Sequence, residues 1–201
     1  MLFLAVFCGF LAEYQLEHKI EKEREKVYMN SLYQDLKSDT LNLGILLNNT
    51  KDDVENYDSL FNIFRSKQYL QETSGAYFFG RKLVTIRVFY PTNGTITQLE
   101  NSGGLRLIRS RAIVDSIQSY QQAISYLTSI QEFQNDHFVL ARSLMGKIFD
   151  ADVFDTMTGD GSKPLERPLI NYPLMPFTKS ELNDFHIPMN FIKRNKITQI
   201  A

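Results

Sequence analysis

The pattern of hydrophobic and polar positions begins with an apolar run and continues into a charged stretch. Residues 2–12 read LFLAVFCGFLA, whereas residues 13–26 alternate acids and bases, with pairs such as Lys19 and Glu23 one helical turn apart. Residues 13–26 contain neither Gly nor Pro. The pattern therefore predicts one helix that passes without a break from the apolar run into a solvated segment.

Two further apolar stripes predict a helical hairpin. The first stripe continues the N-terminal helix, which is expected to end at Asn48 and Asn49. Thr50 and Asp53, three positions apart, then resemble a capping box that starts a second helix. The stripes consist of Tyr28, Leu32, Leu36, Leu43 and Leu47, followed by Val54, Tyr57, Phe61 and Phe64.

The next segment leaves helix and strand both open. SGAYFFG is bounded by glycines, and KLVTIRVFY is rich in β-branched and aromatic residues that alternate at Val84, Ile86, Val88 and Tyr90. PTNGT then predicts a turn. We therefore expect residues 66–98 to be rich in loops.

The clearest periodic segment spans residues 113–148 and predicts a long core helix. After it, residues 150–177 concentrate acids, glycines and prolines, which predicts loops. Thr178 and Glu181 again resemble a capping box, here for a short helix that ends at Phe185. The stripe of the long helix consists of Ile113, Ile117, Tyr120, Ile124, Leu127, Ile130, Gln134, His137, Ala141, Leu144 and Ile148.

Composition limits the possible classes of function. The chain has 22 Lys and Arg against 23 Asp and Glu, a net charge of -1, so no broad positive field attracts nucleic acid. Its single cysteine, Cys8, excludes an internal disulfide and zinc sites built from several thiolates. His18, His137 and His186 are far apart in sequence. We expect no nucleic-acid partner, no metal and no cofactor.

The apolar start has several interpretations. A membrane-spanning helix needs about 20 apolar residues, and residues 1–12 reach only about 18 Å of the roughly 30 Å hydrocarbon layer. A signal peptide would carry basic residues before the apolar run, and a lipoprotein signal would place a small residue, not Phe7, before Cys8. The remaining interpretations are the second half of a transmembrane helix that begins upstream, an apolar helix end buried in a partner, and a core helix with a charged extension.

Two stretches are similar to a known family. AEYQLEHKIEKEREKVYMNSLYQDLKSD follows the apolar run, and TITQLENSGGLRLIRSRAIVDSIQSY lies further along the chain. Both resemble an uncharacterised family of membrane-anchored Bacteroidota proteins, domain of unknown function 6090. The resemblance implies one transmembrane helix, with the helical part on the far side of the inner membrane. The matching positions are Asp35 and Leu36, followed by Thr97, Leu99, Ser102, Gly103, Leu105, Leu107 and Ile108.

The segment LENSGGLRLIRSRAIVD contains the candidate binding site. Its two glycines allow a close approach of the backbone, and a helix bearing three arginines is expected to follow. Exposed amides at a helix start beside arginines would form a pocket for a carboxylate or phosphate. In the alternative interpretation, the glycines let two helices pack closely and the arginines pair with acids. The residues of this candidate site are Gly103, Gly104, Arg106, Arg109 and Tyr120, with Arg111 nearby.

Other chemistry-bearing residues give no catalytic signature, and we expect no catalysis. His137 lies on the apolar stripe, where a lone histidine is most often a hydrogen-bonded core residue. Ser102 is not a nucleophile elbow, because Glu100 occupies a position that needs a glycine. Calcium binding is not predicted either, since the required spacing is absent from Asp150, Asp152, Asp155 and Asp160.

Together these patterns predict a mainly α-helical protein, a bundle of long helices. We expect residues 1–12 to form the C-terminal part of a transmembrane anchor, residues 13–27 a charged helical stalk, and residues 28–201 a helical domain, with both termini truncated. Such a chain is expected to be a membrane-anchored interaction or signal-relay module with a protein partner or a second copy, its soluble part in the periplasm. The alternative function is an extracytoplasmic sensor of a small anionic ligand near Gly103 and Arg106.

Overall fold

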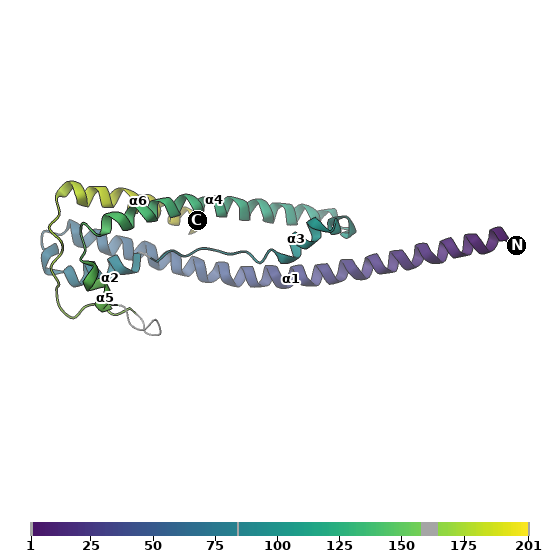
Figure 1. The fold of residues 1–201 in the computed structure, drawn as a ribbon, viewed down its shortest axis with the longest axis horizontal. Helices are drawn as coiled ribbons and strands as arrows, with labels where there is room; N and C mark the ends of the chain where they lie inside the picture. Colours follow the sequence, from purple (N-terminus) through teal and green to yellow (C-terminus); the bar gives the residue numbers. More distant parts are fainter. Residues whose placement is uncertain (1, 84, 158–164, 201) are drawn as a thin grey trace. The chain divides into compact units, whose positions relative to one another are not determined.

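The computed structural model describes residues 2–83, 85–157 and 165–200. These residues are mainly helical and contain no strand, which confirms the predicted fold class at that level (Figure 1). The α-helices are α1 (Leu2–Arg65), α2 (Thr73–Leu83), α3 (Gly94–Asn101), α4 (Arg111–Met145), α5 (Ala151–Met157) and α6 (Lys179–Ile200). Two short 3-10 helices are η1 (Tyr69–Gln71) and η2 (Gly104–Leu107).

The chain divides into two compact units. Unit 1 comprises Met1–Leu43 and Tyr90–Tyr126, and unit 2 comprises Gly44–Phe89 and Leu127–Ala201. Both long helices, α1 and α4, therefore contribute residues to each unit. Each unit has a hydrophobic core of its own.

The helix α1 is uninterrupted, so the predicted hairpin is wrong. The continuity predicted for its apolar and charged parts is confirmed. Beyond them, the buried face follows alternating steps of three and four through the predicted break, and burial against the core holds the helix where a pair of asparagines would favour an end. The predicted capping residues are thus core residues. The buried positions on this face are Thr50, Asp53, Tyr57, Leu60 and Phe64.

In unit 1, a small core forms between α1, α3, η2 and the first part of α4. Two carboxylates of α1 hold the start of α3: Asp35 accepts the amide of Thr95 at 3.2 Å, and Asp39 accepts the amide of Thr92 at 2.9 Å. Because α3 has no side-chain cap of its own, these bonds satisfy backbone donors near its N-terminus. The buried apolar residues are Leu32, Ile96, Leu99, Ile108 and Ile117.

In unit 2, a larger core is rich in aromatic side chains. Tyr77 of α2 is fully buried. Its hydroxyl donates to the carbonyl oxygen of Pro173 at 2.8 Å and accepts the amide of Asp150 at 3.0 Å, so α2 is tied to the segments before and after α5. The buried aromatic residues are Tyr57, Phe61, Phe64, Tyr77, Phe138, Phe149 and Phe185.

Residues 66–98 contain more helix than predicted, namely η1, α2 and the first half of α3. Residues 85–93 are extended, yet they pair with no strand in the described part of the chain. Phe89 is buried, while Val88 and Tyr90 are exposed, so the alternation seen in the sequence does not mark the buried side. Val84 lies outside the described residues.

The long helix predicted for residues 113–148 is confirmed as α4. None of the stripe positions is exposed, although the helix itself ends at Met145. The next segment, residues 150–177, was expected to be loop, and its described residues contain the short helix α5.

The helix α6 begins with the predicted capping box but is longer than predicted. The amide of Thr178 donates to the Glu181 carboxylate at 2.9 Å, and the amide of Glu181 donates to the Thr178 hydroxyl at 3.2 Å. The helix then continues through Pro188 to Ile200, although proline removes a backbone hydrogen bond. Packing of one face against the core outweighs that loss. The buried apolar residues of this face are Phe185, Met189 and Ile192.

Candidate functional site

Unit 1 contains a groove at the predicted anion site. The groove has a volume of about 750 Å³ and lies between residues 16–31 of α1 and residues 98–107. Gly103, Gly104 and Arg106 are among the residues that line it. Three of the five predicted site residues are therefore brought together.

The two glycines shape the groove through the backbone. Gly103 has a φ of 64°, in the left-handed region, and follows the end of α3. Gly104 is buried, and a Cβ atom there would lie 3.0 Å from Cδ2 of Leu99 and 3.4 Å from Cε2 of Tyr28. This close approach agrees with the alternative interpretation, in which the glycines allow tight packing.

Two backbone amides of this turn are committed within the chain. The amide of Gly103 donates to the carbonyl oxygen of Glu100 at 3.1 Å, and the amide of Arg106 donates to that of Gly103 at 3.3 Å. The next α-helix begins only at Arg111. The prediction of a helix start directly after the glycines is therefore wrong, apart from the single short turn of η2.

Arg109 and Tyr120 face carboxylates elsewhere in unit 1. The amide of Arg109 donates to Glu25 at 2.8 Å, and its Nε atom lies 3.8 Å from the same carboxylate. The hydroxyl of Tyr120 donates to the buried carboxylate of Asp39. Burial, and then this hydrogen bond, raise the pKa of Tyr120. Neither residue lines the groove, so the five predicted residues do not form one site.

The lining of the groove is balanced in charge. It carries three acidic and three basic side chains, so it has no net attraction for an anion. The exposed apolar side chains that line the groove come from α1. The charged residues are Glu17, Glu21, Glu23, Lys19, Arg24 and Arg106, and the exposed apolar residues of α1 are Leu16, Ile20 and Val27.

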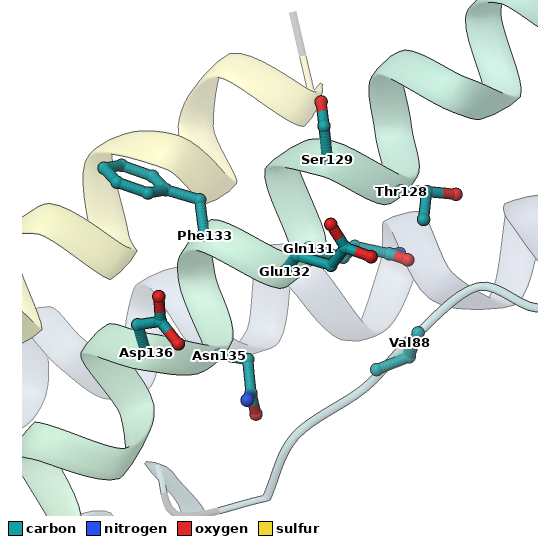
Figure 2. Close-up of a pocket in the computed structure, with 8 residues that line it drawn as sticks. All are labelled: Val88, Thr128, Ser129, Gln131, Glu132, Phe133, Asn135 and Asp136. Carbon is teal, nitrogen blue, oxygen red and sulfur yellow. The ribbon is translucent and has the colours of Figure 1, made fainter.

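Unit 2 contains a second groove, of about 680 Å³, on α4. Figure 2 shows Val88 of the extended segment opposite polar side chains of the helix. Two acids, Glu132 and Asp136, line the groove together with Phe133. All three are exposed and project from one helix. Their polar groups do not converge on a common point, which catalysis or tight ligand binding would require.

The described residues that could bind metal do not gather into a site. No three His, Cys, Asp or Glu side chains among them lie close enough to hold an ion, and Asp160 lies outside the described residues. His137 stacks on Phe191, with ring centroids 4.1 Å apart, and its Nδ1 atom lies 3.0 Å from the carbonyl oxygen of Phe133. His137 is thus hydrogen-bonded and partly buried, as its position on the apolar stripe of α4 predicts.

The burial of two carboxylates, Asp39 and Asp53, was not predicted from the sequence. An oxygen of Asp53 lies 2.5 Å from Nη1 of Arg87, and the other lies 2.8 Å from Nζ of Lys196. Both aspartates interrupt the apolar stripe of α1. An acid on an otherwise apolar helix face is buried only when it has partners. The place of these two acids on the stripe was therefore the signal that could have predicted the buried pairs.

The N-terminal end of α1 exposes its apolar side chains. Phe3 is 83% exposed and Phe10 is 70% exposed, and every residue from 3 to 12 belongs to the exposed class. A contiguous apolar surface of this kind marks a contact with lipid or with another protein. No helix in the described ranges contains an 18-residue stretch apolar enough to cross a bilayer.

Comparison with known proteins gives no relative of this chain. No family model, no curated protein and no solved structure matches it. Membership of the Bacteroidota family that two stretches resemble therefore stays a prediction. The function has to be inferred from the surfaces of the chain itself.

Proposed function

We propose that this chain is a membrane-anchored helical module that acts by binding another protein and not by catalysis. In this proposal the apolar end of α1, residues 3–12, enters the lipid bilayer. The same helix carries the two units outside the bilayer. By the family resemblance, that side is the periplasmic side of a bacterial inner membrane.

One observation carries the proposal, namely that residues 3–12 are apolar and exposed around the whole helix. No charged side chain occurs among them, and each is exposed. A helix that docks in a protein groove usually keeps a polar face toward water, whereas a helix that is apolar all round is buried in a large core or in a membrane. Because the described chain offers this segment no core, lipid is the environment that fits it best.

The charged part of α1 has the properties that a stalk outside the bilayer requires. Residues 13–26 contain five acids and four bases, a net charge of -1. Lys26 and Glu23 pair on the surface at 2.9 Å, as expected for a solvated helix. Because the change from apolar to charged takes place within one unbroken helix, the helix can leave the bilayer and continue into the first unit.

The groove of unit 1 supports the binding part of the proposal. Leu16, Ile20 and Val27 give it an exposed apolar part, surrounded by charges of both signs. An apolar centre with a polar rim is typical of protein–protein contacts. The anion-sensor alternative gains no such support, because acids and bases are equal in number in the groove and the amides of Gly103 and Arg106 donate to carbonyl oxygens of the chain.

The single cysteine gives a direct test of the anchor. Cys8 is exposed within the apolar segment, so an environment-sensitive dye such as NBD can be attached there without any substitution. With phosphatidylcholine vesicles we expect its emission to move to shorter wavelength and to be quenched by nitroxides on the acyl chains. The control is Cys8→Ser with Lys51→Cys, an exposed position of α1 in unit 2, where no change is expected. An unchanged signal at Cys8 would contradict the proposal.

A further inference from the structure

Just beyond the apolar run, an exposed tyrosine stacks on a histidine. The ring centroids of Tyr14 and His18 are 5.2 Å apart, and the ring planes are inclined by 22°. Tyr14 is 55% exposed. The Nδ1 atom of His18 lies 3.8 Å from the carboxylate of Glu21. The pair thus offers an aromatic surface with polar groups on the side toward the charged stalk.

This pair continues the face of α1 that bears the three N-terminal phenylalanines. Positions 3, 7, 10, 14 and 18 follow one another at steps of three and four, so their side chains lie on one side of the helix. Along this face, the side chains change from purely apolar to amphipathic and then to charged. The residues in order are Phe3, Phe7, Phe10, Tyr14, His18 and Glu21.

We infer that the boundary between membrane and water falls at the pair Tyr14 and His18, and that this pair contacts lipid headgroups. The inference rests on the proposed anchoring and adds the depth at which the chain enters the bilayer. Tyrosine favours this layer because its ring has an apolar body and a polar hydroxyl. A helix that ended its contact with lipid earlier would leave Phe10 and Leu11 in water.

Helix length agrees with this depth. With a rise of about 1.5 Å per residue, Tyr14 lies about 4.5 Å and His18 about 10.5 Å beyond Leu11 for a helix along the bilayer normal. The headgroup layer on each side is about 5 to 8 Å thick. Glu25, which binds Arg109 of unit 1, lies about 21 Å beyond Leu11. Tyr14 therefore falls within the headgroup layer, His18 falls about one or two residues beyond it on the water side, and Glu25 falls well outside it.

The charge next to this pair indicates which headgroups fit. Residues 13–26 carry a net charge of -1, from five acids and four bases. A stalk without excess positive charge gains nothing from an anionic surface. The chemistry that fits is a zwitterionic headgroup, with binding that does not depend on salt.

Nitroxide quenching at three depths tests the inference. NBD is attached to Cys8, to Gln15→Cys and to Lys22→Cys, the last two in a Cys8→Ser background, since both positions are exposed. Phosphatidylcholine vesicles carry the nitroxide either on the headgroup or in the middle of the acyl chain, and iodide serves as the aqueous quencher. We expect Cys8 to be quenched most by the acyl-chain nitroxide, position 15 by the headgroup nitroxide, and position 22 by iodide.

The outcomes separate this inference from the anchoring itself. If Cys8 shows no quenching by lipid nitroxides, the anchoring is wrong. If Cys8 is quenched by lipid nitroxides but position 15 is quenched most by the acyl-chain nitroxide or by iodide, the anchoring stands and the boundary is misplaced. As a second readout, Tyr14→Ala is expected to weaken vesicle partitioning several-fold, whereas Tyr33→Ala, an exposed tyrosine in unit 1, should leave it unchanged. Equal partitioning of the two variants would also overturn the inference.

Discussion

The ammonium group of Lys196, on α6, lies 2.8 Å from the carboxylate of Asp53, on α1, and both side chains are buried. The other oxygen of that carboxylate lies 2.5 Å from the guanidinium of Arg87. One acid of unit 2 thus holds two bases from segments that are remote in sequence. A buried ion pair is sensitive to the loss of one member, because the remaining charge is then left without compensation.

We therefore expect Asp53→Asn to lower the free energy of unfolding by about 3 to 5 kcal/mol. The substitution keeps the shape of the side chain but leaves Lys196 buried and Arg87 unpaired. The measurement is urea-induced unfolding followed by circular dichroism. Lys193→Met is the control, because Lys193 and Asp58 form a pair whose side chains are 21% and 48% exposed, and a pair that is open to water contributes about 1 kcal/mol or less. If the two variants lose the same free energy of unfolding, burial does not make the ion pairs of Asp53 more important for stability than the pair of Lys193 and Asp58.

A second prediction concerns the buried carboxylate of unit 1. Tyr120→Phe removes the hydroxyl that donates to Asp39. The amide of Thr92 then remains as the hydrogen-bond donor to that acid within the described chain. We expect a loss of about 1 to 3 kcal/mol in the free energy of unfolding, the usual cost of an unsatisfied buried polar group. Tyr33→Phe, at an exposed position, should change nothing. A loss common to both variants would argue against the hydrogen bond as the cause.

The glycines of unit 1 give a third prediction. Gly103→Ala should destabilise the protein by about 1 to 2 kcal/mol, because its φ of 64° disfavours any residue with a Cβ atom. Gly94→Ala is the matched control: the new Cβ meets nothing within 4 Å, and φ there is not positive. That variant should be neutral or slightly more stable. The measurement is thermal unfolding of both variants and the parent. A Gly103→Ala variant as stable as the parent would contradict the assigned backbone conformation.

Sequence patterns predicted α4 as one long helix, and the helical character of α1, because both have a periodic buried face. The stripe of α4 was recognisable from its spacing alone, and so was the capping box of Thr178 and Glu181. The break at Asn48 was predicted wrongly, because local propensity there is outweighed by packing in unit 2. The length of α6 was missed for the same reason. Pro188 favours the end of a helix, but the buried face continues beyond it and holds the helix together.

The candidate site was predicted only in its local part. Gly103, Gly104 and Arg106 are neighbours in sequence, and the structure keeps them together. Arg109 and Tyr120 pair instead with Glu25 and Asp39, which lie 84 and 81 residues away. Pairing over such distances leaves no trace in the spacing of a single sequence, so the partners could not be foreseen.

A fourth prediction tests the anchor by substitution. Phe7→Asp places a charge in the middle of the apolar segment, where lipid insertion makes a carboxylate costly. We expect the variant to remain in solution when phosphatidylcholine vesicles are floated, while the parent protein floats with them. Because Phe7 is exposed and contacts no core, its thermal unfolding should match that of the parent. Flotation of the variant at the level of the parent would contradict lipid insertion of this segment.

The fifth prediction is a dependence of stability on pH. The ring of His186 lies 4.4 Å from that of Phe61 and 6.2 Å from that of Phe64, measured between centroids. Its Nε2 atom is buried and has no hydrogen-bond partner within the described chain. Burial, and then the charge of Arg65, lower the pKa of His186 below its ordinary value.

The sign follows from proton binding. Between the lowered pKa and the ordinary value of about 6.5, the unfolded chain binds more protons than the folded chain, so stability rises with pH. The contribution is fully present above the ordinary value and is lost as the pH falls through the lowered pKa. We expect His186→Gln to flatten the free energy of unfolding between about pH 7 and pH 5, whereas His18→Gln, at an exposed position, should keep the slope of the parent. Urea unfolding across this range measures the slope, and equal slopes in parent and His186→Gln would rule out His186 as its source.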